Sequence, residues 1–367
     1  MTTMAPLPAW RDLADLLAVA APDDDALAAP WRRGNEGAVW FSRGAWALAA
    51  LVRWWQDGRD RPARLWLPDY FCDASSTGAR DNGAELVFYP VGEDLQPRWP
   101  VLRALARSAP PDLFAVVHYF GQAADGHAAR AFCAETGALM IEDAAHVTAP
   151  APGIGVYGDF VLYCPHKTLA VPDGAVLLVR DRSRAAALTR AGAGPGHGAP
   201  AAAPWLARRL VQKCLPAALL KARVRLTGPA FGDDPPVRVL APTPALSRVA
   251  RRTLTRVRDK LAAARRQRRR NEETLRRACD GRAGYRPFFA SAPDAPYRFV
   301  LDCADGGEDR FLALRRRGCP AETWPDLPPE VLAEPERHAA AVALRRRLVF
   351  LPVHQSVAPR HLSDWLI

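Results

Sequence analysis

Lysine is scarce in this chain. Of its 50 basic residues only four are lysines, at positions 167, 213, 221 and 260, and the other 46 are arginines. This skew is typical of a coding-composition bias rather than of a functional choice. The formal net charge of +11 would suit anionic substrates or a membrane surface. Because no known nucleic-acid-binding motif accompanies the charge, we expect no nucleic-acid partner.

Paired cysteines and long hydrophobic runs are also missing. The seven cysteines form no CxxC pair and their number is odd, which fits reduced thiols better than a disulfide framework and argues against a cysteine metal site. No run approaches the roughly 18 apolar residues that span a bilayer. The stretch LADLLAVAA near the start lacks a basic leader, so we expect no signal peptide and a cytoplasmic location.

Short apolar runs alternate with helical patterns from about residue 36 to 180. The runs are ARLWLP, AELVFYPV, LFAVVHYF, ALMIED, FVLYC and AVLLV. Patterns such as WPVLRALARSA and ADGHAARAFCAETG, with helical periodicity, lie between them. This alternation predicts βαβ units and an α/β domain with a mostly parallel central sheet.

The second half of the chain is organised differently. Residues 192–204 form a Gly/Ala/Pro-rich stretch of low complexity, and a basic helix with a proline kink is expected over 205–226. We interpret that helix as packed on its own protein, with contact to a membrane surface as the less favoured alternative. Apolar spacing predicts one long helix over 246–279, in which RRQRRRNEETLRR is interpreted as a solvated face. The prediction is a large domain over 1–235, including the 192–235 segment, and a small C-terminal α/β domain over 236–367.

An acidic pair follows one of the predicted strands, in IEDAAH at residues 141–146. Ligands of open α/β sheets bind outside the carboxyl ends of strands, so this pair is well placed. Strand alternation sends Glu142 and Asp143 to opposite faces, and at most one of them can point into a given site. A helix cap by Asp143 is the structural alternative.

Lys167 lies 24 residues beyond Asp143, after the next predicted strand, and so approaches the same sheet edge. Apolar surroundings would lower its pKa and make the amine available as a nucleophile. Arginine cannot replace it, because a guanidinium stays charged and forms no Schiff base. An ordinary solvated lysine remains the alternative.

A helical pattern opens at Gly44 in SRGAWAL, and helix N-termini bind phosphate through backbone N–H groups. Simple helix entry would also explain this glycine. A lysine for a Schiff base, an aspartate for a pyridinium N–H and a helix N-terminus for a phosphate are together the parts of a pyridoxal 5'-phosphate site.

The order of these parts resembles the DegT/DnrJ/EryC1/StrS aminotransferases. The resemblance runs through LPDYFCDASSTGARDNGAELVFYPV, VVHYFGQAADGHAARAFCAETGALMIEDAAH and GDFVLYCPHKTLAVPDGA, and returns in FLPVHQSVAPRHLSDWL. It covers about residues 36–180 well and 240–367 loosely. It implies an aspartate-aminotransferase-like fold of type I, pyridoxal phosphate as cofactor, and a homodimer. The implied reaction moves an amine from an amino-acid donor to a keto-sugar, expected to be nucleotide-linked, for polysaccharide or natural-product sugars.

The resemblance also implies roles for single residues. Lys167 would bind the cofactor covalently and then move the proton of the transamination, and Asp143 would pair with the pyridine nitrogen. His146 would contact the ring near its 3-hydroxyl. Tyr70 or Phe71 would stack on the ring. The phosphate would be bound by backbone groups of Gly44 and Ala45 and by Cys164.

The chain departs from the family at several positions. Cys164 stands where a phosphate-binding serine is usual, and thiols are weaker hydrogen-bond partners. Ala45 and Trp46 replace smaller or hydroxyl residues of the usual SGT-A-A-L pattern. The asparagine segment that reaches a neighbouring subunit has no clear match. Some relatives carry histidine in place of the lysine and are sugar dehydratases. His166 precedes Lys167, but the alignment favours the lysine.

Two alternatives to a catalytic function are compatible with the sequence. One is a non-catalytic binding or scaffold relative, against which the retention of both Asp143 and Lys167 argues. The other is a metal site formed by His118, Asp143 and His146, which we do not favour. His118 and His354 match strand ends in the family and are interpreted as structural histidines.

Overall fold

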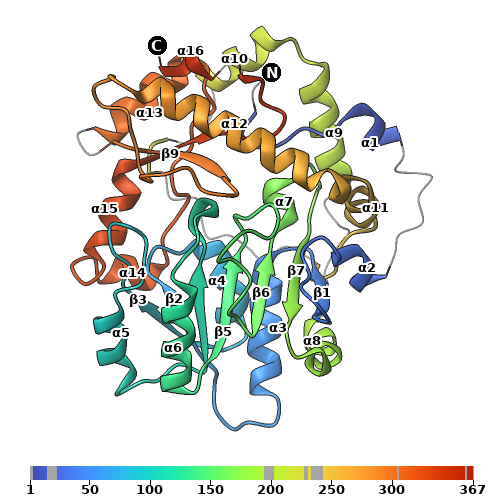
Figure 1. The fold of residues 1–367 in the computed structure, drawn as a ribbon, viewed down its shortest axis with the longest axis vertical. Helices are drawn as coiled ribbons and strands as arrows, with labels where there is room; N and C mark the ends of the chain where they lie inside the picture. Colours follow the sequence, from blue (N-terminus) through green and yellow to red (C-terminus); the bar gives the residue numbers. More distant parts are fainter. Residues whose placement is uncertain are drawn as a thin grey trace.

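The computed structural model describes residues 3–14, 23–193, 202–226, 230–232, 243–303, 306–359 and 362–366. Figure 1 shows a large central sheet with a smaller sheet beyond one of its edges. The expected domain boundary between residues 235 and 236 lies outside the described residues, as does most of the 192–204 stretch. The division into two domains therefore stays a prediction.

The central sheet has seven strands in the order β1-β7-β6-β5-β4-β2-β3. Its strands are β1 (Gly37–Phe41), β2 (Arg64–Pro68), β3 (Glu85–Tyr89), β4 (Leu113–Val117), β5 (Leu139–Ala144), β6 (Phe160–Tyr163) and β7 (Ala175–Val179). Pairing is parallel from β3 through β6, and β7 is antiparallel to both of its neighbours. The prediction of a mostly parallel α/β sheet is confirmed.

One strand of the central sheet was missed by the sequence prediction. β1 reads GAVWF and is followed after two residues by helix α3 (Gly44–Gln56), which reads GAWALAALVRWWQ. All five residues of β1 are buried, so the strand has no polar alternation to separate it from the apolar helix that follows.

Helices cover both faces of this sheet. Figure 1 shows α5 (Trp99–Ala106) and α6 (Gly126–Thr136) in front of it and α3 behind, beside which α4 (Asp73–Asp81) and α8 (Ala185–Gly192) pack. Asp125 caps α6 by accepting from the Ala128 N–H, and Gly137, with φ of 75°, ends it. Gly78 lets α4 approach the first turn of α3, because a Cβ there would lie 2.3 Å from the Ala45 carbonyl oxygen. The second half of α4 thus packs against the N-terminal turn of α3.

A three-stranded antiparallel sheet in the order β10-β9-β8 forms the second core. Its strands are β8 (Arg286–Pro287), β9 (Arg298–Asp302) and β10 (Leu348–Pro352). The helices of this region are α12 (Leu261–Cys279), α13 (Gly307–Arg316), α14 (Pro329–Ala333), α15 (Ala339–Arg347) and α16 (Ser363–Leu366). The apolar faces of α12, α13 and α16 share a buried cluster with β9 and β10 that includes Leu275, Phe299, Phe311 and Trp365. The buried apolar residues of α14 and α15 belong instead to the core of the central sheet.

The prediction of one helix over 246–279 is wrong. The structure has α11 (Arg248–Val257), a short 3₁₀ turn over Arg258–Lys260, and α12. The apolar stripe is continuous in sequence, but its two ends pack into different hydrophobic cores. Leu254 packs beneath the central sheet, whereas Leu275 packs against the small sheet.

The basic segment is likewise two helices, α9 (Ala202–Cys214) and α10 (Ala217–Leu226). They are separated at Pro216, which lacks the N–H that a continuous helix needs. At the N-terminus, α1 (Trp10–Ala14) and α2 (Asp24–Ala28) contact α11. Within the described residues, we find no helix with the length and apolar character needed to span a membrane.

Candidate active site

The carboxyl ends of three central strands meet at one edge. Asp143 pairs in register with Val117 of β4 and with Leu162 of β6. β6 ends at Tyr163, and the short helix α7 (Pro165–Thr168) then carries Lys167 back toward the same edge. Strand order thereby brings Asp143 and Lys167 together, as the sequence spacing predicted.

A cavity of about 320 Å³ lies at this edge. Asp143, Lys167, Cys164, Gly44 and Ala45 all line it. Its other lining residues are Arg43, Leu48, Cys72, Ala74, Ser75, Ala145, Leu162 and His166. Five of the eight residues predicted for a cofactor site therefore surround a single space.

A narrower cavity of about 20 Å³ adjoins the first. The two share Cys72, Ser75, Asp143, Ala145 and Lys167 as lining residues, so they are parts of one site. His146 and Phe71 line this narrower part, together with Val117, Tyr119 and Trp324. Seven of the eight predicted residues thus line the site, and Tyr70 is the exception.

Lys167 is held in a more polar environment than its apolar sequence neighbours indicate. Burial alone would lower the pKa of this ammonium, but Cys164, Tyr297 and Asp143 together outweigh it and the pKa lies above its ordinary value. The expectation of a lowered pKa is therefore wrong for the protein without cofactor. Burial raises the pKa of Cys164 to about 12, so that thiol is protonated at neutral pH. Asp143 is then the carboxylate that Lys167 faces.

Burial also raises the pKa of Asp143, and the charge of Lys167 opposes the rise. Asp143 accepts a hydrogen bond from the backbone N–H of Ala145 at 2.9 Å, which fixes the carboxyl group at the turn after β5. The cost of burying a lone carboxylate is high. A cationic partner in the cavity would therefore be bound favourably, and a pyridinium N–H is such a partner.

Glu142 serves the opposite face of β5 and is structural. Its carboxylate accepts from the backbone N–H groups of Gly155 and Tyr157, each at 2.6 Å, and from Gly158 at 2.5 Å. His118 completes the set, with its Nε2 2.9 Å from Glu142 Oε2. The Ala124 N–H donates to His118 Nδ1 at 3.0 Å, so Nε2 carries the proton and donates to Glu142.

His146 lies against an aromatic ring from the small sheet region. Its ring is stacked on that of Tyr297, with centroids 4.5 Å apart and planes 11° apart. The Phe120 N–H donates to Nδ1 at 3.2 Å, and burial, with the charges of Lys167 and Arg298, holds the pKa of His146 well below its ordinary value. The imidazole is therefore neutral and has its proton on Nε2.

A tight turn sets the position of Tyr297. Its backbone N–H donates to the Phe120 carbonyl at 2.9 Å. Gly121, with φ of 89°, permits this contact, because a Cβ there would lie 1.9 Å from the Ala295 carbonyl oxygen.

The two candidates for ring stacking occupy different places. Tyr70 is fully buried and stacks on Trp324, with ring centroids 4.4 Å apart, and it does not line the site. Phe71 does line it. The geometry therefore favours Phe71. Trp324 was missed by the sequence prediction because no local pattern links it to a site more than 150 residues upstream.

The N-terminal turn of α3 borders the cavity at the place where the sequence predicted an anion site. The Gly44 N–H donates to the Cys164 sulfur. Two groups that the sequence prediction missed lie here, namely Arg43, directly before Gly44, and Ser75, in the first turn of α4. Arg43 donates to the carbonyl oxygens of Ser42 at 2.9 Å and of Pro172 at 3.2 Å. Burial lowers the pKa of Arg43, and the negative charge of Asp173 opposes this shift.

A buried arginine braces the loop that carries the lysine. Arg268 of α12 donates to the Thr168 carbonyl at 2.7 Å and to the Tyr297 carbonyl at 3.2 Å. Burial lowers its pKa to about 9. His166 donates from Nδ1 to the Gly174 carbonyl at 2.9 Å and lines only the wider part of the site. Lys167, not His166, therefore lies next to His146 and Asp143.

Both ring nitrogens of His354 are hydrogen-bonded in the structure. It is fully buried, its Nε2 lies 2.6 Å from the Thr3 carbonyl oxygen, and the Ser356 N–H donates to its Nδ1 at 3.2 Å. It lines neither part of the site.

A model of the DegT/DnrJ/EryC1/StrS aminotransferase family matches residues 108–194. This segment runs from β4 to α8 and includes Asp143, His146, Cys164 and Lys167. This match confirms the family resemblance seen in the sequence over these residues. The protein is a pyridoxal-phosphate-dependent aminotransferase. Among proteins of curated function, none matches this sequence.

Solved structures share the whole fold at low identity. The aminotransferase PseC of Helicobacter pylori, involved in the biosynthesis of pseudoaminic acid, is 12% identical with a TM-score of 0.70, over 97% of this chain and 94% of that chain. The aminotransferase TlmJ of Streptoalloteichus hindustanus is 17% identical with a TM-score of 0.71, over 100% and 96%. A Streptococcus pneumoniae protein in its PLP form is 11% identical with a TM-score of 0.69, over 100% and 96%. These likenesses establish fold type I for this chain.

The residues present fit the cofactor of this family. A buried carboxylate faces a lysine across one cavity, and a helix N-terminus with an arginine beside it borders the same cavity. The side-chain hydroxyls usual at positions 45 and 164 are missing, but Arg43 and the Ser75 hydroxyl lie within reach of the same space. We propose that these two side chains bind the cofactor phosphate in their place.

Replacing Arg43 with methionine is expected to weaken pyridoxal 5'-phosphate binding by about tenfold or more, since a charge-assisted hydrogen bond to phosphate contributes about 1.5–3 kcal/mol. Binding of pyridoxal, which lacks the phosphate, should change by less than about twofold. Absorbance titration of both ligands measures the difference. Equal losses for the two ligands would show that Arg43 acts only through the local fold.

Proposed function

We propose that this aminotransferase moves an amino group from an amino acid to a keto-sugar, and that the sugar is nucleotide-linked. The observation that carries the proposal is the joint lining of one buried cavity by Lys167, Asp143 and the N-terminus of α3. The structural neighbours support the choice of substrate class, since PseC takes part in pseudoaminic acid biosynthesis and another neighbour, DesI, was solved with its TDP-sugar product.

Lys167, Asp143 and His146 would have separate roles in the amino transfer. When bound, pyridoxal phosphate supplies the electron sink that lets a proton leave the carbon bearing the amine. Lys167 Nζ would bind the aldehyde covalently and, once displaced by the amino donor, would accept that proton and return it at the neighbouring carbon. Asp143 would hold the proton on the ring nitrogen. His146, neutral and protonated at Nε2, would donate a hydrogen bond to the ring's oxygen substituent.

The raised pKa of Lys167 fits a lysine that starts as an ammonium and loses its proton on reacting. In the protein without cofactor the ammonium is stabilised by Asp143 and its other neighbours. A pyridinium N–H paired with Asp143 would remove this stabilisation, because the carboxylate would then be neutralised by the ring. The same carboxylate would thus stabilise the lysine before cofactor binding and the ring afterwards.

A spectral screen tests the proposed function. The visible band of the purified, cofactor-loaded protein should change on adding an amino donor such as glutamate, and should return on adding the correct nucleotide-linked keto-sugar. Return with an α-keto acid but with none of a panel of keto-sugars would contradict the sugar substrate. Loss of water from a sugar without any amino transfer would instead indicate a dehydratase. The homodimer and the cytoplasmic location remain predictions.

A further inference from the structure

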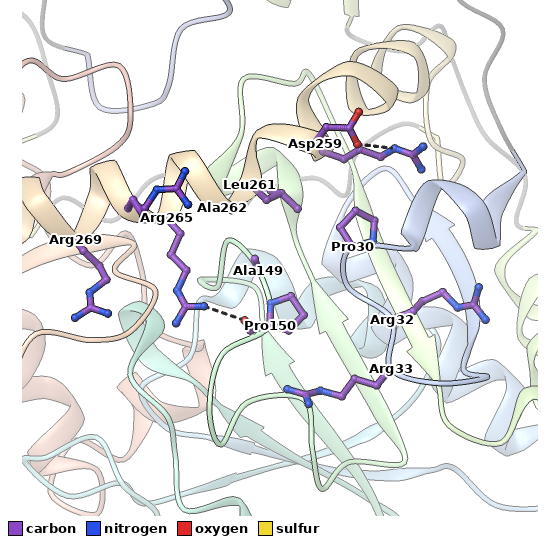
Figure 2. A pocket seen from close by; sticks show the side chains of 12 residues that line it. Pro30, Arg32, Arg33, Ala149, Pro150, Asp259, Leu261, Ala262, Arg265 and Arg269 are labelled. Atoms are coloured by element: carbon purple, nitrogen blue, oxygen red, sulfur yellow. Dashed lines mark hydrogen bonds and ion pairs between the residues drawn. The ribbon is translucent and has the colours of Figure 1, made fainter.

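A second cavity, of about 740 Å³, lies away from the cofactor site. It runs between the first turns of α12, the segment at Ala149 and Pro150, and the loop at residues 30–33, as Figure 2 shows. Its lining includes six arginines, namely Arg32, Arg33, Arg258, Arg265, Arg266 and Arg269, and we call it the arginine groove. It shares no lining residue with either part of the cofactor site.

Positive charge exceeds negative charge in the arginine groove. The described ion pairs of its arginines bring in three carboxylates. Asp25 lies 3.9 Å from Arg32, Asp259 lies 3.7 Å from Arg258, and Asp294 lies 3.6 Å from Arg265 and 3.5 Å from Arg269. Six guanidinium groups thus face three carboxylates, and like charges held close together attract anions strongly.

Backbone carbonyls hold several of these guanidinium groups in place. Arg33 donates to the Ile154 carbonyl at 3.0 Å, and Arg265 donates to the Asp294 carbonyl at 2.8 Å and to the Pro150 carbonyl at 3.3 Å. Each guanidinium has five N–H donors, so these contacts orient the group without using all of them. Arg266 and Arg269 are exposed on α12 at the edge of the groove.

The surface between the charges is apolar. Pro30, Ala149, Pro150, Leu261 and Ala262 line the groove, and Figure 2 shows Pro150 and Ala149 between α12 and the loop at residues 30–33. An apolar surface reduces competition from water, which strengthens hydrogen bonds to an anion bound over it. The run RRQRRRNEETLRR therefore does more than solvate a helix face, because three of its arginines line this groove.

We propose that the arginine groove binds the pyrophosphate group of a phosphorylated small molecule. Guanidinium groups match phosphate oxygens as two-pronged donors. Arginines from two sides of the groove, Arg33 on one and Arg266 and Arg269 on the other, suit a ligand with two adjacent phosphoryl groups better than a single phosphate. Since the groove is separate from the cofactor site, this ligand and pyridoxal phosphate bind at the same time, and the inference does not depend on the proposed function.

Calorimetric titration of the cofactor-saturated protein with sodium pyrophosphate at low ionic strength tests this proposal. We expect one saturable site whose affinity falls as sodium chloride is added. The double variant R266Q/R269Q should lose about tenfold or more in affinity. The matched control R270Q/R277Q removes the same charge from exposed positions of α12 outside the groove and should change affinity by less than about twofold.

Arg33→Gln, on the opposite side of the groove, provides an independent second measurement and should also weaken binding. Absence of saturable binding to the wild-type protein, equal losses in the two double variants, or displacement of pyridoxal phosphate by pyrophosphate would each overturn the proposal. A nucleoside diphosphate in the same titration identifies the source of the group. Tighter binding than pyrophosphate assigns a nucleotide ligand, and equal affinity assigns pyrophosphate itself.

Discussion

Lys167→Ala is expected to lower the rate of amino transfer at least about 1,000-fold, because one side chain supplies both the covalent link to the cofactor and the proton transfer. The cofactor should still bind through Asp143 and the N-terminus of α3, but it should no longer be fixed to the protein by borohydride. Single-turnover absorbance with an amino donor measures the rate. Mass spectrometry of peptides after borohydride treatment locates the label.

Two controls separate the chemistry of the Lys167 amine from its charge. Lys167→Arg keeps a cation beside Asp143 but cannot form the covalent link, so it should be as inactive as the alanine variant. Lys213→Ala removes a lysine that donates to the Pro8 carbonyl and does not line the cavity, and it should leave rate and label unchanged. Substantial activity of Lys167→Arg would assign the catalytic proton transfer to another group, with His166 the first to examine.

Strand order explains why the centre of the site was predictable from sequence. Asp143 lies at the carboxyl end of β5 and Lys167 follows β6, and these adjacent parallel strands end at the same sheet edge. Alternation along β5 likewise separates Asp143 from Glu142, which the structure assigns to backbone N–H groups and His118. These inferences needed only local patterns and one rule of sheet topology.

The residues that reach the site from distant parts of the chain could not be predicted in that way. Trp324 and Tyr297 reach the cavity and His146 from the far half of the chain, through contacts such as that of Tyr297 with Phe120. The raised pKa of Lys167 has the same origin, because it depends on side chains from β5, the 69–73 loop and the small sheet region together. Arg43 was visible in SRGAWAL, but its place at the cavity depends on the start of α3.

The arginine groove shows that the role of a charged surface run is equally hard to predict from sequence alone. Residues 265–277 contain an arginine run that helical periodicity alone assigns to solvent. Only the packing of α12 beside Ala149 and Pro150 sets three of these arginines opposite Arg32 and Arg33. A run of charged residues can form part of a binding site when the fold places a second element of the same charge opposite it.

Asp143→Asn is expected to lower the rate of amino transfer by about 100- to 5,000-fold, since removing one member of a buried ion pair costs about 3–5 kcal/mol. Without the carboxylate, the ring nitrogen of the bound cofactor would lose its proton and the electron sink would weaken. Asparagine has nearly the same shape, and its Oδ1 can still accept from the Ala145 N–H that Asp143 contacts at 2.9 Å. The fold around the turn should therefore be preserved, and the melting temperature of the cofactor-free variant should confirm it.

The position of the cofactor absorbance band and its dependence on pH distinguish this electronic role of Asp143 from a purely structural one. In the wild-type protein the ring nitrogen should stay protonated across the neutral range, because a buried carboxylate favours the charged form of its partner. In Asp143→Asn the band should report an unprotonated ring. Asp143→Glu keeps the charge and should retain more activity than the asparagine variant. An asparagine variant with the wild-type rate and band would show that Asp143 does not pair with the ring, leaving its electrostatic interaction with Lys167 as its role.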